Sequence, residues 1–169
     1  FFADKIILIE GDTERILFPT FMRKMDIEEE KESMKGTGEQ KKQEKQLPLL
    51  SQNISIVEVG AHSQIYEKLI AFLGIKTLII TDIDSEKPGK SKKGTDTHVP
   101  CRVNEGTQTG NIALRHYLDK DWKTLKLLPK NDRTFRFAGS KALISYQSLE
   151  EKYQARSFED AFIHINLEF

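Results

Sequence analysis

The sequence predicts an α/β fold with a mainly parallel central sheet flanked by helices. Short apolar runs over 5–10, 54–59 and 77–81 predict three strands. The first and the last of these runs are apolar on both faces, which is typical of buried parallel strands. Helical patterns lie between the runs, so the predicted order is strand, helix, strand, helix, strand. The 169 residues are enough for one domain, and they contain no internal repeat.

The first strand leads into a predicted helix. Glu10 ends the strand, and Gly11-Asp12-Thr13 offers a turn and a helix N-cap. Apolar residues then recur at helical spacing, which predicts a helix over 13–25 with Pro19 as a candidate kink. The stretch that follows is rich in Glu, Lys and Gln, so we expect a charged, flexible insertion or loop over 27–52.

The remainder of the chain alternates in the same way. An amphipathic helix over 65–73 is ended by Gly74. The third strand runs into Asp82-Ile83-Asp84-Ser85, and the Lys/Gly-rich stretch 86–97 predicts a surface loop. The remaining expected elements are a short helix over 111–118, a small extra β element with strands over 135–138 and 142–146, and a helix start at Ser157.

Composition excludes several classes of protein. Lys plus Arg and Asp plus Glu both total 26, so the net charge of zero excludes a domain that coats nucleic acid by charge alone. The single cysteine, Cys101, cannot form an internal disulfide, which favours a reducing compartment. No run of 18 apolar residues occurs, so we expect no membrane span. The opening residues resemble neither a signal peptide nor a natural amino terminus, and we expect a domain of a longer protein.

Acidic residues follow two of the predicted strands. Glu10 ends the first strand, and Asp82 and Asp84 follow the third. Ligands of open parallel sheets bind beyond the carboxyl ends of the strands, so these carboxylates converge if the two strands are neighbours. Glu14 lies one helical turn after Glu10 and can face the same place.

Clustered carboxylates repel one another unless a cation lies between them. Oxygen ligands select hard divalent ions such as Mg²⁺ or Mn²⁺, and two such ions can clamp both the attacking and the leaving oxygen of a phosphodiester. Each acid also has a simpler interpretation, because Glu10 suits a strand end, Glu14 suits a solvated helix face, and Asp-x-Asp is common on loops. The convergence of the acids is the observation that favours a metal site.

Longer motifs sharpen this interpretation. The run Glu10-Gly-Asp-Thr-Glu-Arg15 after one strand and Thr81-Asp-Ile-Asp-Ser85 after another resemble the TOPRIM domain. With them, the stretches 2–15, 56–60, 72–85, 104–111 and 153–162 make the chain similar to the TOPRIM domain of the overcoming-lysogenization-defect (OLD) family of ATP-dependent nucleases. The resemblance covers nearly the whole chain, and implies a single Rossmann-like TOPRIM domain over 1–169.

The resemblance implies a metal-dependent DNA endonuclease with a two-metal mechanism that uses Mg²⁺ or Mn²⁺. Glu10, Asp82 and Asp84 match the catalytic acids. The metal ligands that it implies are Glu10, Glu14, Asp82, Asp84, Ser85, Glu159 and Asp160, with the choice between the last two left open. DNA contacts are expected from Lys87, Lys90, Lys92, Lys93 and Arg156, although a solvated loop and a helix-entry role are alternatives for these cations.

The same resemblance implies partners. We expect DNA as the substrate, an ABC-type ATPase domain in the same full-length chain, an oligomer formed through that domain, and a helicase partner. A cytoplasmic location in a prokaryote and a role in anti-phage defence follow from the same likeness.

Two other hypotheses stay open. The family carries a lysine in a stretch after the late acidic motif, and this sequence stops at Phe169 before any such stretch. A non-catalytic module that docks DNA or a protein is therefore an alternative. A receiver-like phosphotransfer domain would need a lysine and a hydroxyl residue at later strand ends, and Lys141 and Ser145 fit those positions poorly.

Overall fold

A five-stranded sheet with the order β2-β1-β3-β8-β7 forms the centre of the computed structural model, which describes residues 3–35, 47–118, 120–128, 134–136 and 142–147. Four strands are parallel, and β7 runs antiparallel to β8. A second, antiparallel sheet has the order β5-β4-β6. The predicted α/β class is therefore confirmed. The strands are β1 (Lys5–Ile9), β2 (Ile54–Glu58), β3 (Lys76–Asp82), β4 (Ser85–Lys90), β5 (Asp96–Pro100), β6 (Gln108–Thr109), β7 (Thr134–Arg136) and β8 (Ala142–Gln147).

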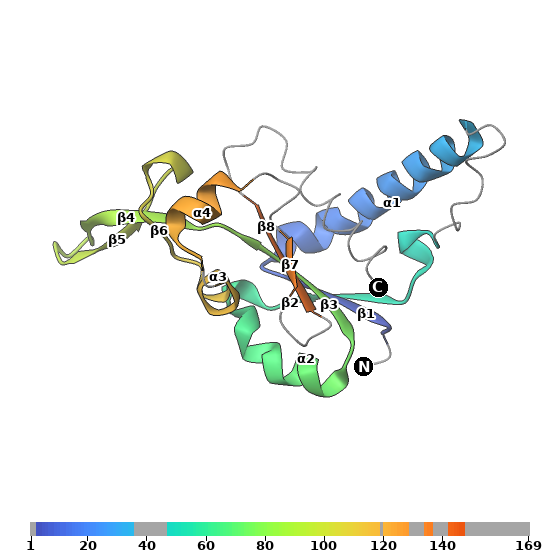
Figure 1. Cartoon of the computed structure of the whole chain (residues 1–169), viewed down its shortest axis with the longest axis horizontal. Helices are drawn as coiled ribbons and strands as arrows, with labels where there is room; N and C mark the ends of the chain where they lie inside the picture. Colours follow the sequence, from blue (N-terminus) through green and yellow to red (C-terminus); the bar gives the residue numbers. More distant parts are fainter. Residues whose placement is uncertain (1–2, 36–46, 119, 129–133, 137–141, 148–169) are drawn as a thin grey trace.

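Helices cover both faces of the central sheet. In Figure 1, α1 and α2 lie on opposite sides of it. The α-helices among the described residues are α1 (Asp12–Lys35), α2 (Glu67–Leu73), α3 (Ile112–Tyr117) and α4 (Trp122–Leu127). Short 3-10 turns occur at Leu49–Ser51, Gly60–Tyr66 and Val103–Glu105. Within the described ranges, no helix is both long enough and apolar enough to cross a membrane.

Alternate residues of the central strands build two separate cores. On β1, Ile7 and Ile9 pack in the cluster that contains Phe18 of α1. Ile6 and Leu8 belong to the other cluster, on the side of α2, α3 and α4. All four β1 residues are buried because side chains alternate between the two faces of a strand and helices cover both faces. This arrangement explains why the strand is apolar on both faces.

Helix α1 is longer than predicted. It continues through Pro19 and ends at Lys35 rather than near residue 25. Residues 28–35 are Glu, Lys, Ser and Met, which are tolerated in helices without burial. The Lys24 ammonium lies 3.8 Å from the Glu28 carboxylate one turn away. The expectation of a loop from residue 27 was therefore wrong for the part of the insertion up to Lys35.

The far end of the expected insertion is anchored to α1. The Asp26 carboxylate accepts hydrogen bonds from the backbone N–H groups of Leu49, at 2.7 Å, and Leu50, at 3.2 Å. The Leu49 side chain is buried in the α1 core cluster. Residues 36–46 lie outside the described residues, so the flexible insertion stays a prediction there.

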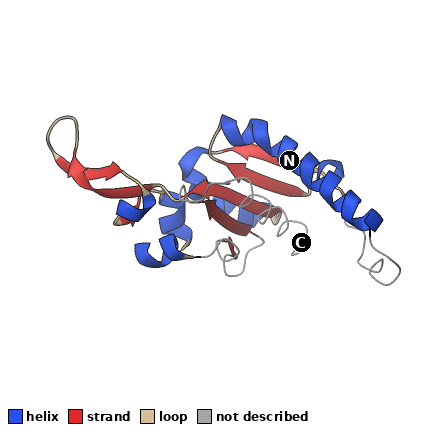
Figure 2. Cartoon of the chain, turned by 90° about the horizontal axis from the view of Figure 1, so that it is seen from above, coloured by secondary structure: helices blue, strands red, loops and turns tan. Residues whose placement is uncertain are grey.

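The stretch 86–97 forms two strands joined by a turn rather than the expected loop. Strands β4 and β5 make an antiparallel hairpin in which Gly89 lies opposite Thr97. A side chain at Gly89 would collide with Val99, and Gly94, at the turn, has a φ of 78° that favours glycine. Figures 1 and 2 both show this hairpin extending away from the central sheet. Lysine and glycine content misled the prediction, because a two-stranded arm needs little apolar sequence.

Smaller differences concern the ends of elements. The helix expected over 65–73 begins as a 3-10 turn, continues as α2, and ends at Gly74 with a φ of 61°. The short helix and the two late strands occur where they were expected, as α3, β7 and β8. Helix α4 and strand β6 were not predicted, and the helix start at Ser157 lies outside the described residues.

Candidate active site

The ends of β1 and β3 bring Glu10 beside Asp82. The two strands are parallel neighbours, with Leu8 opposite Ile79. The Glu10 carboxylate oxygen Oε1 accepts hydrogen bonds from the Thr81 hydroxyl and from the backbone N–H of Asp82, the latter at 3.3 Å. The strand adjacency that the predicted convergence required is therefore present.

Asn111 links the acids, and the sequence interpretation missed it. Its side chain is 0% exposed. The amide nitrogen Nδ2 lies 3.0 Å from Glu10 Oε1 and 3.4 Å from Asp84 Oδ2, so a single donor group reaches carboxylates from two segments. The available signal was an asparagine directly before a short helix, where it reads as an N-cap. That signal does not reveal that α3 begins beside the strand ends.

Asp84 sits in a constrained turn. Its φ of 45° lies in the left-handed region, which non-glycine residues rarely adopt. The Asp84 carbonyl accepts from the N–H of Gly110 at 2.6 Å, and the preceding carbonyl, of Ile83, accepts from the Thr109 hydroxyl at 2.5 Å. The 109–111 segment therefore fixes the turn that carries Asp84.

The surroundings of Asp84 disfavour its charged form. The side chain keeps solvent contact, yet partial burial of its carboxyl group and the nearby Asp82 raise its pKa, with a further contribution from Glu86. The hydrogen bond from Asn111 acts in the opposite direction and lowers the pKa. A divalent cation at this edge would relieve the repulsion among these carboxylates.

Glu14 caps its own helix. Its Oε2 accepts from the backbone N–H of Gly11 at 3.1 Å, which satisfies a donor at the beginning of α1. The neighbouring ion pair, between Asp12 and Arg15, lies at the surface. The contact to Gly11 supports a helix-capping role, and the metal role of Glu14 stays a prediction.

The Ser85 hydroxyl contacts the segment 101–102. This buried hydroxyl donates to the Arg102 carbonyl at 3.1 Å and lies 3.4 Å from the Cys101 sulfur. These contacts tie the base of the β4–β5 hairpin to the following segment, so they favour a structural role. Glu159, Asp160 and Arg156 lie outside the described residues.

The hairpin lysines have different surroundings. Lys87 pairs with Glu105 at 2.5 Å, and Lys90 lies 3.8 Å from Asp96. Lys92 and Lys93 are exposed in the turn between β4 and β5. The two turn lysines are therefore better placed than Lys87 to contact a phosphate backbone.

The donor set at the strand ends suits a hard divalent cation. Glu10, Asp82 and Asp84 offer oxygen ligands only, the kind that Mg²⁺ and Mn²⁺ prefer. In the part of the chain that the structure describes, no three Asp, Glu, His or Cys side chains lie close enough to hold one ion. In this geometry Glu10 and Asp84 instead share the Asn111 amide.

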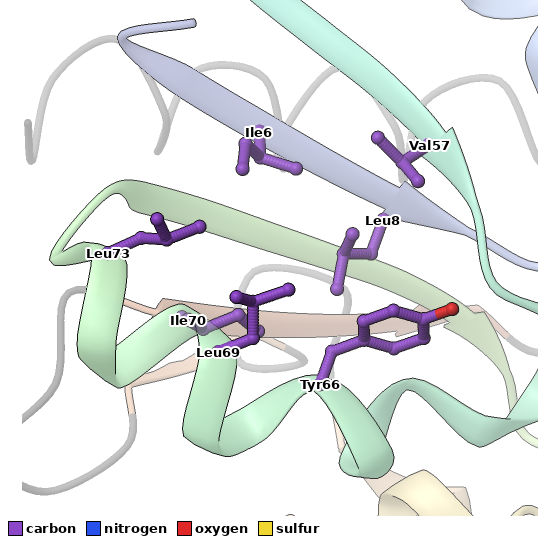
Figure 3. Close-up of a pocket in the computed structure, with 7 residues that line it drawn as sticks. All are labelled: Ile6, Leu8, Val57, Tyr66, Leu69, Ile70 and Leu73. Carbon is purple, nitrogen blue, oxygen red and sulfur yellow. The ribbon is translucent and has the colours of Figure 1, made fainter. Parts of the chain in front are cut away.

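A pocket elsewhere on the molecule has a different character. It measures about 140 Å³ and lies between α2 and the sheet, where Leu69, Ile70 and Leu73 point towards β1 (Figure 3). Its lining residues are Ile6, Leu8, Val57, Tyr66, Leu69, Ile70 and Leu73. A pocket lined by carbon with a single hydroxyl group does not suit phosphodiester chemistry.

Two comparisons with known proteins find similarity to this chain. Residues 1–84 match the family model of the overcoming lysogenization defect protein-like TOPRIM domain. The chain is 30% identical over 167 residues to Endonuclease GajA of Bacillus cereus (strain HuB5-5), an alignment that covers 98% of this chain and 20% of that protein. The chain thus spans about one fifth of that relative's length, and no solved structure matches it. Residues 1–84 of this chain therefore match the OLD-like TOPRIM family.

Proposed function

We propose that this chain is the nuclease domain of an enzyme that hydrolyses DNA phosphodiester bonds with divalent metal ions. The observation that carries the proposal is that Glu10, directly after β1, lies beside Asp82 at the end of β3 and shares the Asn111 amide with Asp84, at the edge where parallel sheets bind ligands. The family match over residues 1–84 and the similarity to an endonuclease support the same conclusion.

The residues of this chain have distinct proposed roles. Glu10, Asp82 and Asp84 would hold Mg²⁺ or Mn²⁺, with Glu14, Ser85, Glu159 and Asp160 as further predicted ligands. When bound, two such ions supply a nucleophilic water at neutral pH and neutralise charge on the phosphate. Lys92 and Lys93 would bind the DNA backbone electrostatically and orient it along the hairpin.

The wider setting is also a proposal. Since the relative is about five times as long as this chain, we propose that the full-length protein carries further domains, including an ABC-type ATPase domain. We place that protein in the prokaryotic cytoplasm, with DNA as its substrate and anti-phage defence as its role. An oligomer formed through the ATPase domain and a helicase partner belong to the same proposal.

A plasmid cleavage assay tests the proposal. Supercoiled DNA would be incubated with Mn²⁺ or Mg²⁺ and either the chain or the full-length protein, each as wild type and as Asp82→Asn. We expect metal-dependent nicking or linearisation that Asp82→Asn abolishes. Asp96→Asn, an exposed change on β5, is the matched control and should cleave normally.

Each outcome of the assay has a defined meaning. If the full-length protein cleaves DNA and the isolated chain does not, the chemistry needs residues outside this chain. Unchanged cleavage by full-length Asp82→Asn would contradict the assignment of the site. DNA binding without cleavage by any form would favour the docking-module alternative.

A further inference from the structure

Asn111 is a fully buried polar side chain between the acids and a helix. Burial of an amide without hydrogen bonds is costly, so the partners of its two polar atoms indicate what it does. The oxygen Oδ1 accepts from the backbone N–H of Leu114 at 2.9 Å, which caps α3. The nitrogen Nδ2 faces the strand ends.

The orientation of this amide follows from chemistry. A flipped amide would set its oxygen against the acceptor oxygens of the strand ends and its NH₂ group against the N–H of Leu114. Only the present orientation satisfies both ends. The amide therefore acts as a donor towards the acids and as an acceptor towards α3.

The amide nitrogen has more acceptors than protons. Besides Glu10 and Asp84, it lies 2.6 Å from the Thr81 hydroxyl oxygen and 3.0 Å from the Asp82 carbonyl. An NH₂ group has two protons for these four acceptors. The acceptors come from β1, from β3 and from the Asp84 turn, so one group joins three segments.

The backbone around Asn111 holds the same turn. Its N–H donates to the Thr109 hydroxyl at 3.0 Å, and that hydroxyl donates to the carbonyl of Ile83. The N–H of Gly110 donates to the carbonyl of Asp84. The side chain and the backbone of the 109–111 segment therefore act together on the acidic turn.

We propose that Asn111 is a positioning residue of the acidic site, whose amide holds Glu10 and Asp84 in place for a divalent cation. The inference rests on the proposed function. The hydrogen bonds to Glu10 end on Oε1, and the bond to Asp84 ends on Oδ2. Among the described residues, no hydrogen bond is made to the second oxygen of either carboxylate, which leaves that oxygen available for a cation. Hydrogen-bonded partners of this kind orient metal ligands, and their removal commonly weakens metal binding by about 10–100-fold.

Two cap variants test this role by calorimetry with Mn²⁺ alone. Asn111→Ser keeps a capping hydroxyl for α3 but removes the amide. Asp121→Ser is the matched control, because Asp121 caps α4 rather than α3, by accepting from the N–H of Thr124 at 2.7 Å. We expect Mn²⁺ affinity to fall on the order of tenfold in Asn111→Ser and to stay at the wild-type value in Asp121→Ser.

The results that would overturn the inference are equally specific. Wild-type Mn²⁺ affinity in Asn111→Ser, with circular dichroism showing a folded chain, would leave Asn111 as a helix cap only. An equal loss in Asp121→Ser would assign the effect to general destabilisation.

A second variant decides the matter if Asn111→Ser does not fold or if the wild type binds no Mn²⁺. Asn111→Asp keeps the cap, since Asp and Asn cap equally well, but turns a donor into a negative charge beside Glu10 and Asp84. In EDTA at neutral pH we expect its melting temperature to fall below that of the wild type, whereas the control change Asp121→Asn should have little effect. A wild-type melting temperature for Asn111→Asp would overturn the inference, whereas absent Mn²⁺ binding alone would count against the proposed function.

Discussion

Individual carboxylates at the edge of the sheet differ in the hydrogen bonds that they accept. Glu10 accepts hydrogen bonds at one oxygen from a hydroxyl, a backbone N–H and an amide. Asp84 accepts a long bond from Asn111 and lies near Asp82 and Glu86. Because the pKa of Asp84 is raised, ionisation of this acid opposes folding when no metal is bound.

Replacement of Asp84 by asparagine should change the pH dependence of stability. Since the pKa of Asp84 is raised above 3.8, the folded chain favours the protonated acid, and the wild type loses stability as pH rises from there through the raised pKa. In EDTA, we expect Asp84→Asn to be more stable than the wild type at pH 7, with the difference shrinking towards pH 4. Urea unfolding between pH 4 and pH 7 measures this difference. A gain in the free energy of unfolding that is the same at every pH would instead indicate relief of backbone strain at position 84, whose left-handed conformation asparagine also tolerates.

The hairpin of β4 and β5 is the element that gives the acidic edge a basic neighbour. It begins at Ser85, directly after the acidic pair, and carries Lys92 and Lys93 in its turn. Lys87 and Lys90 face acids within the protein. The hairpin can therefore contribute to DNA binding mainly through its turn.

Removal of the two turn lysines should weaken DNA binding in a salt-dependent manner. For duplex DNA, the slope of log K against log salt becomes shallower by about 0.9 for each phosphate that the protein no longer neutralises. We expect Lys92→Ala with Lys93→Ala to reduce that slope by about 1 to 2, and Lys68→Ala, an exposed change on α2, to leave it unchanged. Fluorescence anisotropy over a salt series gives the slopes. An identical slope in the double variant would remove the hairpin from the DNA interface.

Strand β8 and helix α4 are joined by a buried hydrogen bond. The Tyr146 hydroxyl donates to the carbonyl of Leu125 at 2.8 Å, and the tyrosine is 1% exposed. We expect Tyr146→Phe to lower the free energy of unfolding by about 1 kcal/mol, because a buried acceptor loses this donor. Tyr117→Phe, which removes a longer bond of 3.3 Å to Ser63 in a half-buried place, should cost less. If urea unfolding shows that both variants lose the same free energy of unfolding, burial is not the reason why the Tyr146 hydrogen bond contributes more.

On the scale of the whole molecule, the described residues form a core on each face of the central sheet. Phe18 is 0% exposed in the α1 cluster, whereas Phe72 on α2 is 86% exposed. We expect Phe18→Ala to lower the free energy of unfolding by about 3–5 kcal/mol, and Phe72→Ala to change it by less than about 0.5 kcal/mol. Denaturant unfolding compares the two. A large loss from Phe72→Ala would mean that this side chain is covered by another part of the protein.

The sequence was informative where hydrophobic pattern alone determines structure. Buried parallel strands carry their own signature, so β1 and β3 could be predicted. The placing of Glu10 beside Asp82 followed only on the condition that these strands are neighbours, which the structure shows. The length of α1 could not, because the charged residues up to Lys35 also suit a solvated loop.

The site itself was harder to predict than the strands. Asn111 lies 101 positions after Glu10 in the chain, and only the path of the loop before α3 brings the two together. The contacts of Ser85 and the pairing of Lys87 likewise depend on the hairpin, which has no apolar pattern. Contacts that depend on the folded path of polar segments leave no periodic signal in the sequence.

Mn²⁺ titration of the wild type beside Glu10→Gln and Asp82→Asn is the direct test of a cation site at this edge of the sheet. Both variants keep the shape of the side chain and remove its charge, and Asp96→Asn on the hairpin is the control. We expect calorimetry to detect Mn²⁺ binding to the wild type and to the control, and both site variants to bind Mn²⁺ more weakly. Equal affinity in all four proteins would place the cation elsewhere and contradict a metal site formed by Glu10 and Asp82.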